Sequence, residues 1–426
     1  MAYVLFFSLL FILIALGFPI AYSLCLSSAF LILVHLKLPM TLIAQHMFAA
    51  VDSFAFLAIP FFMLAGAFMS SGGVTKRLVS FSYSLVGSFK GGLAQVVAVS
   101  GMFFAAISGS SAAVTAAIGA IMIDAMVEKG YDREFSAGAV AAGGMVGIII
   151  PPSITMVVYG VLAGVSIGDM FLGGFAPGVL MGLSMCAVSY FVSKRHGWGG
   201  EGTFSLKNVW KSFLESFWAL LTPVIIIGGI YGGIFTPTEA ACVAAVYGLF
   251  IGFFVYKELN IKELPSIISK AVVSTTVIMF IIAAANVFGW ILTNAEIPQK
   301  IGKFFIEISG NKYVFLFYIN IMLLILGTMV NPSAAVVILT PILLPAAIQF
   351  GINPVFFGVL MVTNLAIGNI TPPVGLDLFV VSSITKISID RVFRAMLPFL
   401  YILLADLLIV TYVEDIIMFL PRVLAK

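Results

Sequence analysis

Charged residues are scarce in this chain. Lys, Arg, Asp and Glu together make up 9% of its 426 residues, whereas hydrophobic residues make up 62%, and the mean hydropathy is +1.18. A water-soluble domain of this length would expose far more charge. The composition therefore predicts an all-α protein that crosses a lipid bilayer many times.

Other shortages exclude whole classes of chemistry. Cys25, Cys186 and Cys242 lie far apart, so they provide neither metal-ligand spacing nor a disulfide framework. No phosphate-binding loop of the form GxxxxGK[ST] occurs, which excludes ATP as a direct energy source in this chain. Basic residues interleaved with aromatics, as nucleic-acid binding requires, are also missing. No Lys or Arg precedes Lys37, so we expect the first apolar stretch to stay in the membrane rather than act as a cleaved signal peptide.

One helix-breaking pattern occurs twice. SGSSAAV at 108–114 is followed by GIIIPPSI at 147–154, and VNPSAAV at 330–336 is followed by GNITPPVG at 368–375. Each copy places small polar residues and a Pro-Pro pair inside strongly apolar sequence. Interrupted helices at membrane depth are tolerated only where they are buried or line a cavity. The pattern therefore predicts a binding site within the membrane.

Apolar windows of roughly 20 residues, the length that spans a bilayer as a helix, predict about ten spans. They lie near residues 2–17, 18–35, 54–71, 133–163, 170–193, 213–233, 237–256, 271–293, 354–385 and 398–420. Two further apolar pairs, at 92–128 and 313–350, predict re-entrant hairpins whose tips stop midway. Amphipathic stretches near 74–90 and 295–309 could serve as connecting arms.

The positive-inside rule orients this topology. One orientation leaves only six of the 21 Lys and Arg residues outside, namely Lys37, Lys300, Lys303, Lys312, Arg422 and Lys426. Both termini then face outward, the first hairpin enters from the cytoplasm, and the second enters from the opposite side.

The two copies belong to a longer internal repeat. The Pro-Pro pairs are separated by 221 residues, and the SAAV tetrapeptides by 222. We expect a first repeat at 1–200 with its broken helix at 133–163, a cytoplasmic linker at 201–216, and a second repeat at 217–426 with its broken helix at 354–385. Each repeat holds five spans, an odd number, so the second must be inverted. Inverted repeats with broken helices at their interface are typical of secondary transporters.

Backbone electrostatics assign chemistry to the breaks. Carbonyl groups at the end of an interrupted helix lack intrahelical donors and can bind a small hard cation. No His or Cys lies nearby, so an alkali ion such as Na⁺ suits these oxygen ligands better than a transition metal does. The first predicted ion set is Ser108, Gly109, Ser110, Gly147 and Ile150, and the second is Gly327, Thr328, Asn331, Gly368 and Thr371, with Asp377 one turn beyond the second Pro-Pro pair.

Helix restarts after the breaks would present N–H donors to a substrate carboxylate. The predicted substrate-binding residues are Ser111, Pro152, Ser153, Pro332, Pro373, Val374 and Gly375. A structural reading competes with this one, because Pro kinks and Ser back-bonding also occur in ordinary membrane helices. The recurrence of the pattern in inverted register favours function.

Acidic residues elsewhere have competing explanations. In FTPTEAA at 235–241, Thr236, Pro237 and Glu239 fit a capping box, which is a structural use that competes with ion binding. Asp406 lies in the last span, where an intramembrane carboxylate is a proton-relay candidate. Asp124 lies near the cytoplasmic end of the first hairpin, where we expect it to be hydrated or paired.

At this level of detail the chain resembles the large membrane subunit of the tripartite ATP-independent periplasmic (TRAP) transporters. The motifs GFPIAYSL, LAIPFFMLAG, FFAAISGSSAAVTAAIG, GIIIPPSI, GGIYGGIFTPTEAA, ILTPILLP and ITPPVGL occur in family order over essentially the whole chain. The resemblance implies a subunit of the bacterial inner membrane that is not an enzyme. It also implies a sodium-driven importer of organic acids, such as sialic acids or C4-dicarboxylates, that works by an elevator movement with two or more co-transported Na⁺ ions.

The same resemblance implies two partners, a small four-helix membrane subunit and a periplasmic binding protein that delivers the substrate. Relatives often carry an acidic residue where Asn331 stands and Asn where Asp377 stands, so this chain departs from the pattern at its second site. A proton-coupled anion transporter or ion-translocating antiporter subunit is the main alternative, but it would place more titratable residues at mid-span. An intramembrane hydrolase would need a base or a metal pair beside its serines.

Overall fold

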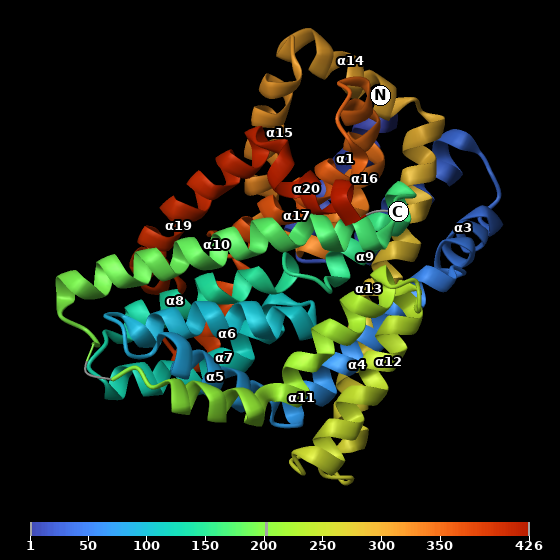
Figure 1. The fold of residues 1–426 in the computed structure, drawn as a ribbon. Coiled ribbons are helices and arrows are strands. Elements are labelled where there is room, and N and C mark those ends of the chain that lie inside the picture. Colours follow the sequence, from blue (N-terminus) through green and yellow to red (C-terminus); the bar gives the residue numbers. More distant parts are fainter. Residues whose placement is uncertain (1, 201–202, 425–426) are drawn as a thin grey trace.

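The computed structural model describes residues 2–200 and 203–424, and within them every regular element is a helix. An isolated bridge between Lys90 and Gly199 is the one β-type pairing among these residues. The predicted all-α class is thus confirmed. Figure 1 shows α10 crossing the molecule, with α6, α7 and α8 on one side of it and α15, α17 and α19 on the other.

The first half of the chain supplies ten α-helices and three short helical turns. They are α1 (Ala2–Ala15), α2 (Ile20–Phe30) with a π turn at Leu31–Leu36, α3 (Thr41–Val51), a 3-10 turn at Phe54–Leu57, α4 (Ala58–Ser71), α5 (Val74–Val86), α6 (Gly92–Ser108), α7 (Ser111–Glu128), α8 (Arg133–Met145), a 3-10 turn at Val146–Ile148, α9 (Ile154–Ala163) and α10 (Ile167–His196).

The second half follows a similar order. Its helices are α11 (Leu206–Tyr231), α12 (Pro237–Phe250) with a π turn at Ile251–Val255, α13 (Leu264–Asn294), α14 (Ile297–Ser309), α15 (Lys312–Gly327), α16 (Pro332–Gln349), α17 (Pro354–Gly368), α18 (Leu376–Thr385), α19 (Ile389–Tyr412) and α20 (Glu414–Leu424). Helices therefore end at both predicted Pro-Pro breaks and at both predicted hairpin tips.

Length and composition alone pick out eight of the described helices as able to cross a membrane, or nine if the bent pair α14–α15 counts as one span. The ten predicted spans do not map onto this set one to one. α1 and α2 are shorter than a full span, and the spans at 133–163 and 354–385 are each divided into two helices. Conversely, α7 and α16 are long and apolar enough to count as spans although we predicted them as hairpin arms.

Three segments differ from the sequence-based expectations. The predicted last span at 398–420 has the wrong bounds, because the apolar helix α19 runs from Ile389 to Tyr412 and a separate helix, α20, follows. Glu414 and Asp415 begin α20, and both pair with its Arg422, which gives that helix a polar side unsuited to a span. Much of the predicted linker at 201–216 is helical, because the Ser205 hydroxyl caps α11 by accepting the N–H of Asn208. α3 was not predicted at all.

The interior is built from contacts between the two halves. α8 packs against α7, α6 and α19, and α10 packs against α6, α17 and α19. α9 of the first half lies on α16 of the second, and α18 of the second lies on α7 of the first. Around this core, α13 packs on α2, α3 and α4, while α4 pairs with α12 and α5 with α11. The pieces on either side of each break are thus held by the opposite half.

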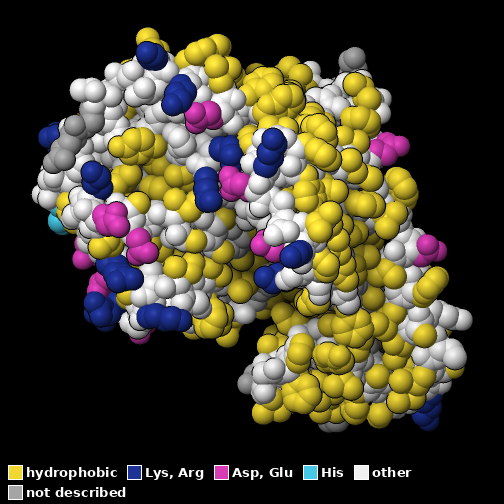
Figure 2. Space-filling view, turned by 90° about the horizontal axis from the view of Figure 1, so that it is seen from below, with side chains coloured by type: hydrophobic (Ala, Val, Ile, Leu, Met, Phe, Trp, Pro, Cys, Tyr) yellow, Lys and Arg dark blue, Asp and Glu magenta, His cyan; other side chains and the backbone are white. Residues whose placement is uncertain are grey.

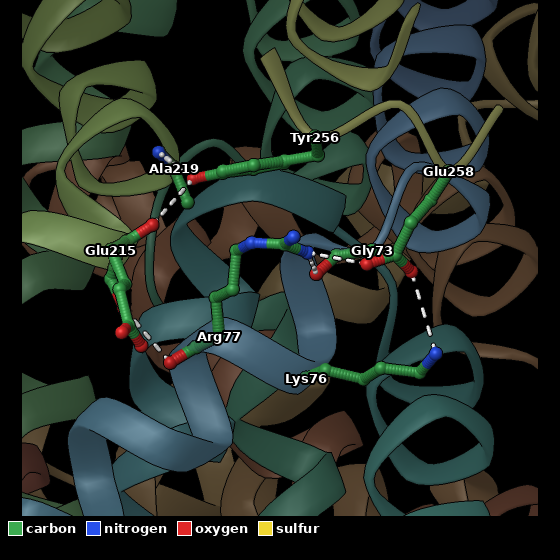
Figure 3. A network of polar contacts seen from close by, with 8 residues as sticks. Gly73, Lys76, Arg77, Glu215, Ala219, Tyr256 and Glu258 are labelled. Carbon is green, nitrogen blue, oxygen red and sulfur yellow. Dashed lines mark hydrogen bonds and ion pairs between the residues drawn. The ribbon is translucent and has the colours of Figure 1, made fainter. Parts of the chain in front are cut away.

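A polar cluster, here called the Arg77 clamp, fastens α5 to its neighbours (Figure 3). The Arg77 guanidinium donates to Glu258 at 2.7 Å and to the Gly73 carbonyl at 2.8 Å, and it lies over the Tyr256 ring at 3.8 Å from the ring centroid. The Tyr256 hydroxyl accepts the N–H of Ala219 on α11 at 3.1 Å. The clamp therefore joins α5, α11 and the turn after α12.

Charged side chains are unevenly distributed over the surface. Figure 2 shows Lys and Arg gathered, with carboxylates between them, over part of the face that it presents, while the adjoining part is largely hydrophobic. Many large apolar side chains are exposed, among them Leu206, Trp210, Phe254 and Ile261. Such extensive apolar exposure suits a lipid-facing surface.

We predict that the Arg77 clamp stabilises the protein in a pH-dependent way. The hydrogen bond from Arg77 holds the pKa of Glu258 below its ordinary value, against the opposing effect of partial burial. Because the folded-state pKa is lowered, the stabilisation is fully present above the ordinary Glu pKa of about 4.3 and is lost as the pH falls toward and through the lowered value. Thermal unfolding in detergent at pH 7 should show a lower midpoint for Glu258→Gln than for wild type.

The matched control is Lys211→Gln, which removes an exposed pair to Glu215 at 4.0 Å and should leave the midpoint unchanged. The double variant Arg77→Gln/Glu258→Gln should cost less than the sum of the single variants, since both remove the same interaction. Strict additivity at pH 7 would contradict the clamp.

Candidate functional site

The first interruption lies where α6 meets α7. α6 ends at Ser108, Gly109 has a left-handed conformation with φ of 64°, and Ser110 is extended. The Gly109 carbonyl accepts a long hydrogen bond, 3.4 Å, from the N–H of Ile154. The tip of the first hairpin is thus held against the start of α9.

The break between α8 and α9 touches the same tip. A Cβ added at Gly147 would lie 2.8 Å from the Ser110 carbonyl oxygen, so only glycine permits this approach. The Ser108 hydroxyl is buried and has no hydrogen-bond partner among the described residues. Four members of the first predicted ion set therefore come together. The side chain of the fifth, Ile150, lies instead against Gly178 of α10.

The second interruption has a different hydrogen-bond pattern. The Thr328 carbonyl, directly after α15, accepts the N–H groups of Val374 at 3.2 Å and Gly375 at 3.1 Å. A Cβ added at Gly368 would lie 2.6 Å from Gly327 Cα, so the two glycine backbones are in direct contact. The Thr371 hydroxyl donates back to the Ile367 carbonyl at 2.9 Å. The structure thus joins the end of α15 to the break between α17 and α18.

Asn331 has a local structural use. Its side-chain oxygen accepts the N–H of Ser333 at 3.0 Å and so caps α16. Among the described residues, no hydrogen bond joins it to Gly368 or Thr371, the neighbours expected from the repeat. Backbone N–H groups at the start of a helix lack intrahelical acceptors, and the short Asn side chain can accept a hydrogen bond from its own helix.

A cavity of about 100 Å³ lies between the two hairpin tips. The first turns of four helices line it: α7 at Ser111, α9 at Thr155, α16 at Ser333 and α18 at Leu376. The hydroxyls of Thr155 and Ser333 are 3.0 Å apart, and this contact joins the two halves of the chain across the site. The positive ends of four helices therefore border one small space, which favours an anion there without any cationic side chain.

The predicted substrate-binding residues divide into two groups. Ser111 and Pro332 line the cavity, together with Gly109, Ser110 and Asn331 from the predicted ion sets. Pro152, Ser153, Pro373, Val374 and Gly375 do not line it. Ser153 is engaged within its own half, since its hydroxyl donates to the Ile148 carbonyl and accepts the N–H of Met156. The N–H groups of Val374 and Gly375 are engaged by Thr328.

Asp377 connects the second break to the first hairpin. It is fully buried on α18 and faces Ser111 and Thr115 of α7 together with Asn369. The Asn369 amide donates to the Ser111 hydroxyl at 2.9 Å and, at 3.4 Å, to Asp377 Oδ2, while Oδ1 has no partner among the described residues. The structure therefore places Asp377 beside the first hairpin and not with Gly327 and Thr328, because α18 packs on α7.

The other acidic candidates lie outside the cavity. Glu239 closes a capping box with Thr236, as the sequence predicted. Asp124 is exposed and pairs with Arg133 at 3.9 Å. Asp406 is buried between α19 and α10, where it accepts the Ser184 hydroxyl at 3.0 Å. That serine precedes it by 222 residues, the offset of the repeat.

Three polar residues of the site were missed by sequence reasoning, namely Thr155, Ser333 and Asn369. Each lies one to three positions from a residue that was named, within GIIIPPSI and the residue after it, VNPSAAV or GNITPPVG. The motifs located the region correctly. Which neighbouring residue faces the cavity depends on the direction in which each side chain points, and this direction cannot be predicted from sequence where the helix is irregular.

Comparisons with known proteins agree on one family. The model of the family described as "Tripartite ATP-independent periplasmic transporter, DctM component" matches residues 7–416. An isethionate TRAP transporter permease protein DctMQ of Oleidesulfovibrio alaskensis is 46% identical over 95% of this chain, although the chain spans only 64% of that relative's length. A C4-dicarboxylate TRAP transporter large permease protein DctM of Pseudomonas aeruginosa is 45% identical over 94% of both chains.

More distant likenesses extend the picture. A sialic acid TRAP transporter large permease protein SiaM of Vibrio cholerae is 39% identical over 95% of both chains. The crystal structure of the YdaH transporter of Alcanivorax borkumensis aligns with a TM-score of 0.62 over 87% of this chain and 86% of its own, at 15% identity. That likeness concerns the fold alone.

We predict that Gly368→Ala disrupts the site. Its Cβ would collide with the backbone of Gly327, and no flexible side chain can move aside to relieve this contact. Displacing a hairpin tip by about 1 Å should reduce transport by roughly ten- to a hundred-fold. Substrate uptake by cells that produce the complete transporter measures this effect, normalised to the amount of permease in the membrane.

Gly228→Ala on α11 is the matched control, because an added Cβ there meets nothing within 4 Å. It should transport like wild type. Equal uptake by the Gly368 and Gly228 variants would show that the close approach of Gly327 and Gly368 is not needed for transport.

Proposed function

This chain belongs to the DctM component family of the tripartite ATP-independent periplasmic transporters, and from that premise we propose that it is the sodium-coupled permease subunit of an organic-acid importer. The observation that supports this most strongly is the cavity between the hairpin tips, where four helix N-termini meet. We propose that the substrate enters from the periplasm and leaves to the cytoplasm through an elevator movement of the hairpins and broken helices.

The cavity suits a small organic anion. Its donors are backbone N–H groups, hydroxyls and amides, and no Lys, Arg or His is among the residues that line it. Neutral, pre-oriented donors bind a carboxylate or sulfonate without the tight ion pair that would hinder release. Ser111, Thr155 and Ser333 are the hydroxyl groups best placed to contact the anion.

Sodium ions would use the oxygen atoms at the breaks. Ser108 offers a buried hydroxyl without a partner, and the Ser110 carbonyl faces Gly147 at the first break. Hard oxygen ligands of this kind suit Na⁺. Two Na⁺ with one monocarboxylate carry one net positive charge inward, and about 100 mV then supplies roughly 2.3 kcal/mol, or about 50-fold accumulation.

We also propose the arrangement of the complete transporter. Relatives carry the name of a large permease, and one is named DctMQ, which supports a small membrane subunit and a periplasmic binding protein as partners. The scarcity of Lys and Arg on one side of the predicted topology supports an orientation with both termini in the periplasm, and the family supports a location in the bacterial inner membrane. Proton coupling is the second candidate, because Asp377 is buried with one carboxylate oxygen unpartnered.

Uptake into liposomes tests the coupling ion. The chain, its small membrane subunit and its binding protein are reconstituted with inward Na⁺, K⁺ or H⁺ gradients, and substrate uptake is followed. We expect accumulation only with the Na⁺ gradient, and a proton gradient alone should give none. Uptake that ignores Na⁺ would reject the proposal, and uptake driven by H⁺ would favour the second candidate.

The same uptake experiment is repeated with variants of the two buried carboxylates, Asp377 and Asp406. Asp377→Asn should raise the Na⁺ concentration for half-maximal uptake by about tenfold or more, because Asp377 lies against the first hairpin tip. Asp406→Asn, a matched change of a buried carboxylate outside the cavity, should have a mild effect. Equal, mild effects of both variants would remove Asp377 from the ion-coupling machinery.

The cavity volume further restricts the substrate. A single water occupies about 10–15 Å³ of such a volume, so a cavity of about 100 Å³ matches an acid of the size of isethionate or a C4-dicarboxylate. Sialic acid, the substrate in the name of one relative, is several times larger. We propose a small carboxylate or sulfonate as the substrate.

We predict that the small acids stabilise the permease and that sialic acid does not. The chain is purified with its small membrane subunit, and its thermal unfolding midpoint is measured in Na⁺ with isethionate, succinate or sialic acid. The same series in K⁺ is the control and should show no stabilisation by any ligand. Stabilisation by sialic acid that equals or exceeds that by the small acids would contradict the size argument.

A further inference from the structure

A second cavity, of about 460 Å³, lies beside the first turn of α6, at the end of the helix opposite Ser108. At a rise of 1.5 Å per residue, the 17 residues of α6 separate the two ends by about 25 Å. Four segments line this cavity: Tyr83 and Gly87 at the end of α5, Leu93 of α6, residues 129–131 after α7, and residues 197–200 after α10. It is therefore distinct from the site between the hairpin tips.

Four helix ends meet at this cavity, and only the start of α6 keeps N–H groups without a backbone acceptor. The end of α5 is closed by the Gly87 N–H, which donates to the Tyr83 carbonyl. The ends of α7 and α10 are closed by their own backbones, since Met126 accepts the N–H groups of Lys129 and Tyr131, and Ser193 accepts those of Gly197 and Trp198. At the start of α6, no side chain caps the helix. The N–H groups of Leu93 and Ala94 donate to no backbone carbonyl in the described part of the chain. The uncompensated end is thus the positive one.

Tyr131 adds a donor at the same place. It is 3% exposed, and its hydroxyl has no hydrogen-bond partner within the described residues. The phenol oxygen faces the N–H of Leu93 and lies next to Gly199, where an added Cβ would come within 2.7 Å of it. Both neighbours line the cavity. The ring packs beside Phe135 and Trp198, with centroids 6.5 and 5.4 Å away.

The Tyr131 hydroxyl is a donor and not an anion at neutral pH. Burial raises its pKa above the ordinary value, although the N–H of Leu93 partly opposes the shift. A buried O–H with no acceptor is costly unless a ligand supplies one. An anionic oxygen is the partner that would satisfy both this O–H and the N–H groups of α6.

Positive side chains border the opening. Lys129 lines the cavity, and the side-chain stem of Lys90 lies beside the rim residue Gly200, where an added Cβ would come within 3.1 Å of Lys90 Cγ. Neither makes an ion pair with any described carboxylate, whereas Lys76, Arg77 and Arg133 nearby in the sequence do. The rim loop contains Gly197, Gly199 and Gly200, all with positive φ, so no side chain of these residues blocks a bulky group.

We propose that this cavity binds a phosphate group through the first turn of α6, the Tyr131 hydroxyl, Lys129 and Lys90. A phosphate offers several acceptor oxygens and a full negative charge, which matches the backbone N–H of Leu93, one O–H donor and two ammonium groups. The phosphate can belong to the headgroup of an anionic phospholipid or to a soluble phosphate. The predicted topology puts the opening on the cytoplasmic side, where either source is present.

Binding measurements on the full chain, co-purified with its small membrane subunit and stripped of lipid, test the proposal. Phosphatidylglycerol is titrated and counted by native mass spectrometry, and inorganic phosphate is titrated in detergent by thermal shift. Tyr131→Phe removes only the hydroxyl and should weaken binding about tenfold. Lys129→Gln should weaken it about threefold. Lys262→Gln, an exposed lysine between α12 and α13 that does not line the cavity, is the matched control and should bind like wild type.

The two probes separate the two sources. Phosphatidylglycerol binding that depends on Tyr131 and Lys129, with no response to millimolar phosphate, assigns the site to a lipid headgroup. Stabilisation by phosphate that depends on the same two residues assigns it to a soluble phosphate. Equal binding of both probes by wild type, Tyr131→Phe and Lys129→Gln overturns the proposal. The readout does not involve transport, so this result is independent of the proposed substrate and coupling ion.

Discussion

The structure depends on one constraint, which is that every peptide group freed by a broken helix inside the membrane must find a partner or a ligand. The first hairpin meets it through the Gly109 carbonyl and the N–H of Ile154, and the second through the Thr328 carbonyl and the N–H groups of Val374 and Gly375. These bonds tie each hairpin tip to the broken helix of its own half. The small cavity between the tips is lined by residues of both hairpins and both broken helices, so the interruptions that require these bonds also form the site.

The two copies of the break differ in polarity as well as in sequence. With the offset of 221 residues, Asn369 corresponds to Ile148 and Asp377 to Met156. The second copy thus has an amide and a carboxylate where the first has two apolar side chains. Because α18 packs on α7, this polar pair serves the first hairpin through Ser111. The polar residues of one half therefore complete the site of the other, which explains why the two halves are not interchangeable.

Sequence patterns predicted most of the core helices, because a helix inside a membrane needs a long apolar run that is easy to recognise. Apolar windows and Pro-Pro pairs placed the core helices and their breaks, and a capping box was correctly assigned to Glu239. α20 was misassigned because its apolar residues continue the hydropathy of α19, while the stop at Val413 is a local backbone change. The partners of Asp377 could not be derived either, since a contact between α18 and α7 joins residues more than 250 positions apart and depends on how the halves pack.

Packing between the halves also limits how the proposed elevator movement would occur. α9 lies on α16, α18 lies on α7, and Thr155 contacts Ser333 across the cavity, so the hairpins and broken helices form one interlocked body. Relative motion must then be taken up outside it, where α5 runs between α4 and α6. The Arg77 clamp fastens the start of α5 to α11 and to the turn after α12. At its other end, the junction to α6 is also held, because the Gly91 N–H donates to the Trp198 carbonyl at 3.1 Å and Lys90 bridges to Gly199. With both ends of α5 fastened, the proposed movement must carry α5 along with a neighbouring helix, because bending at either end would break these contacts.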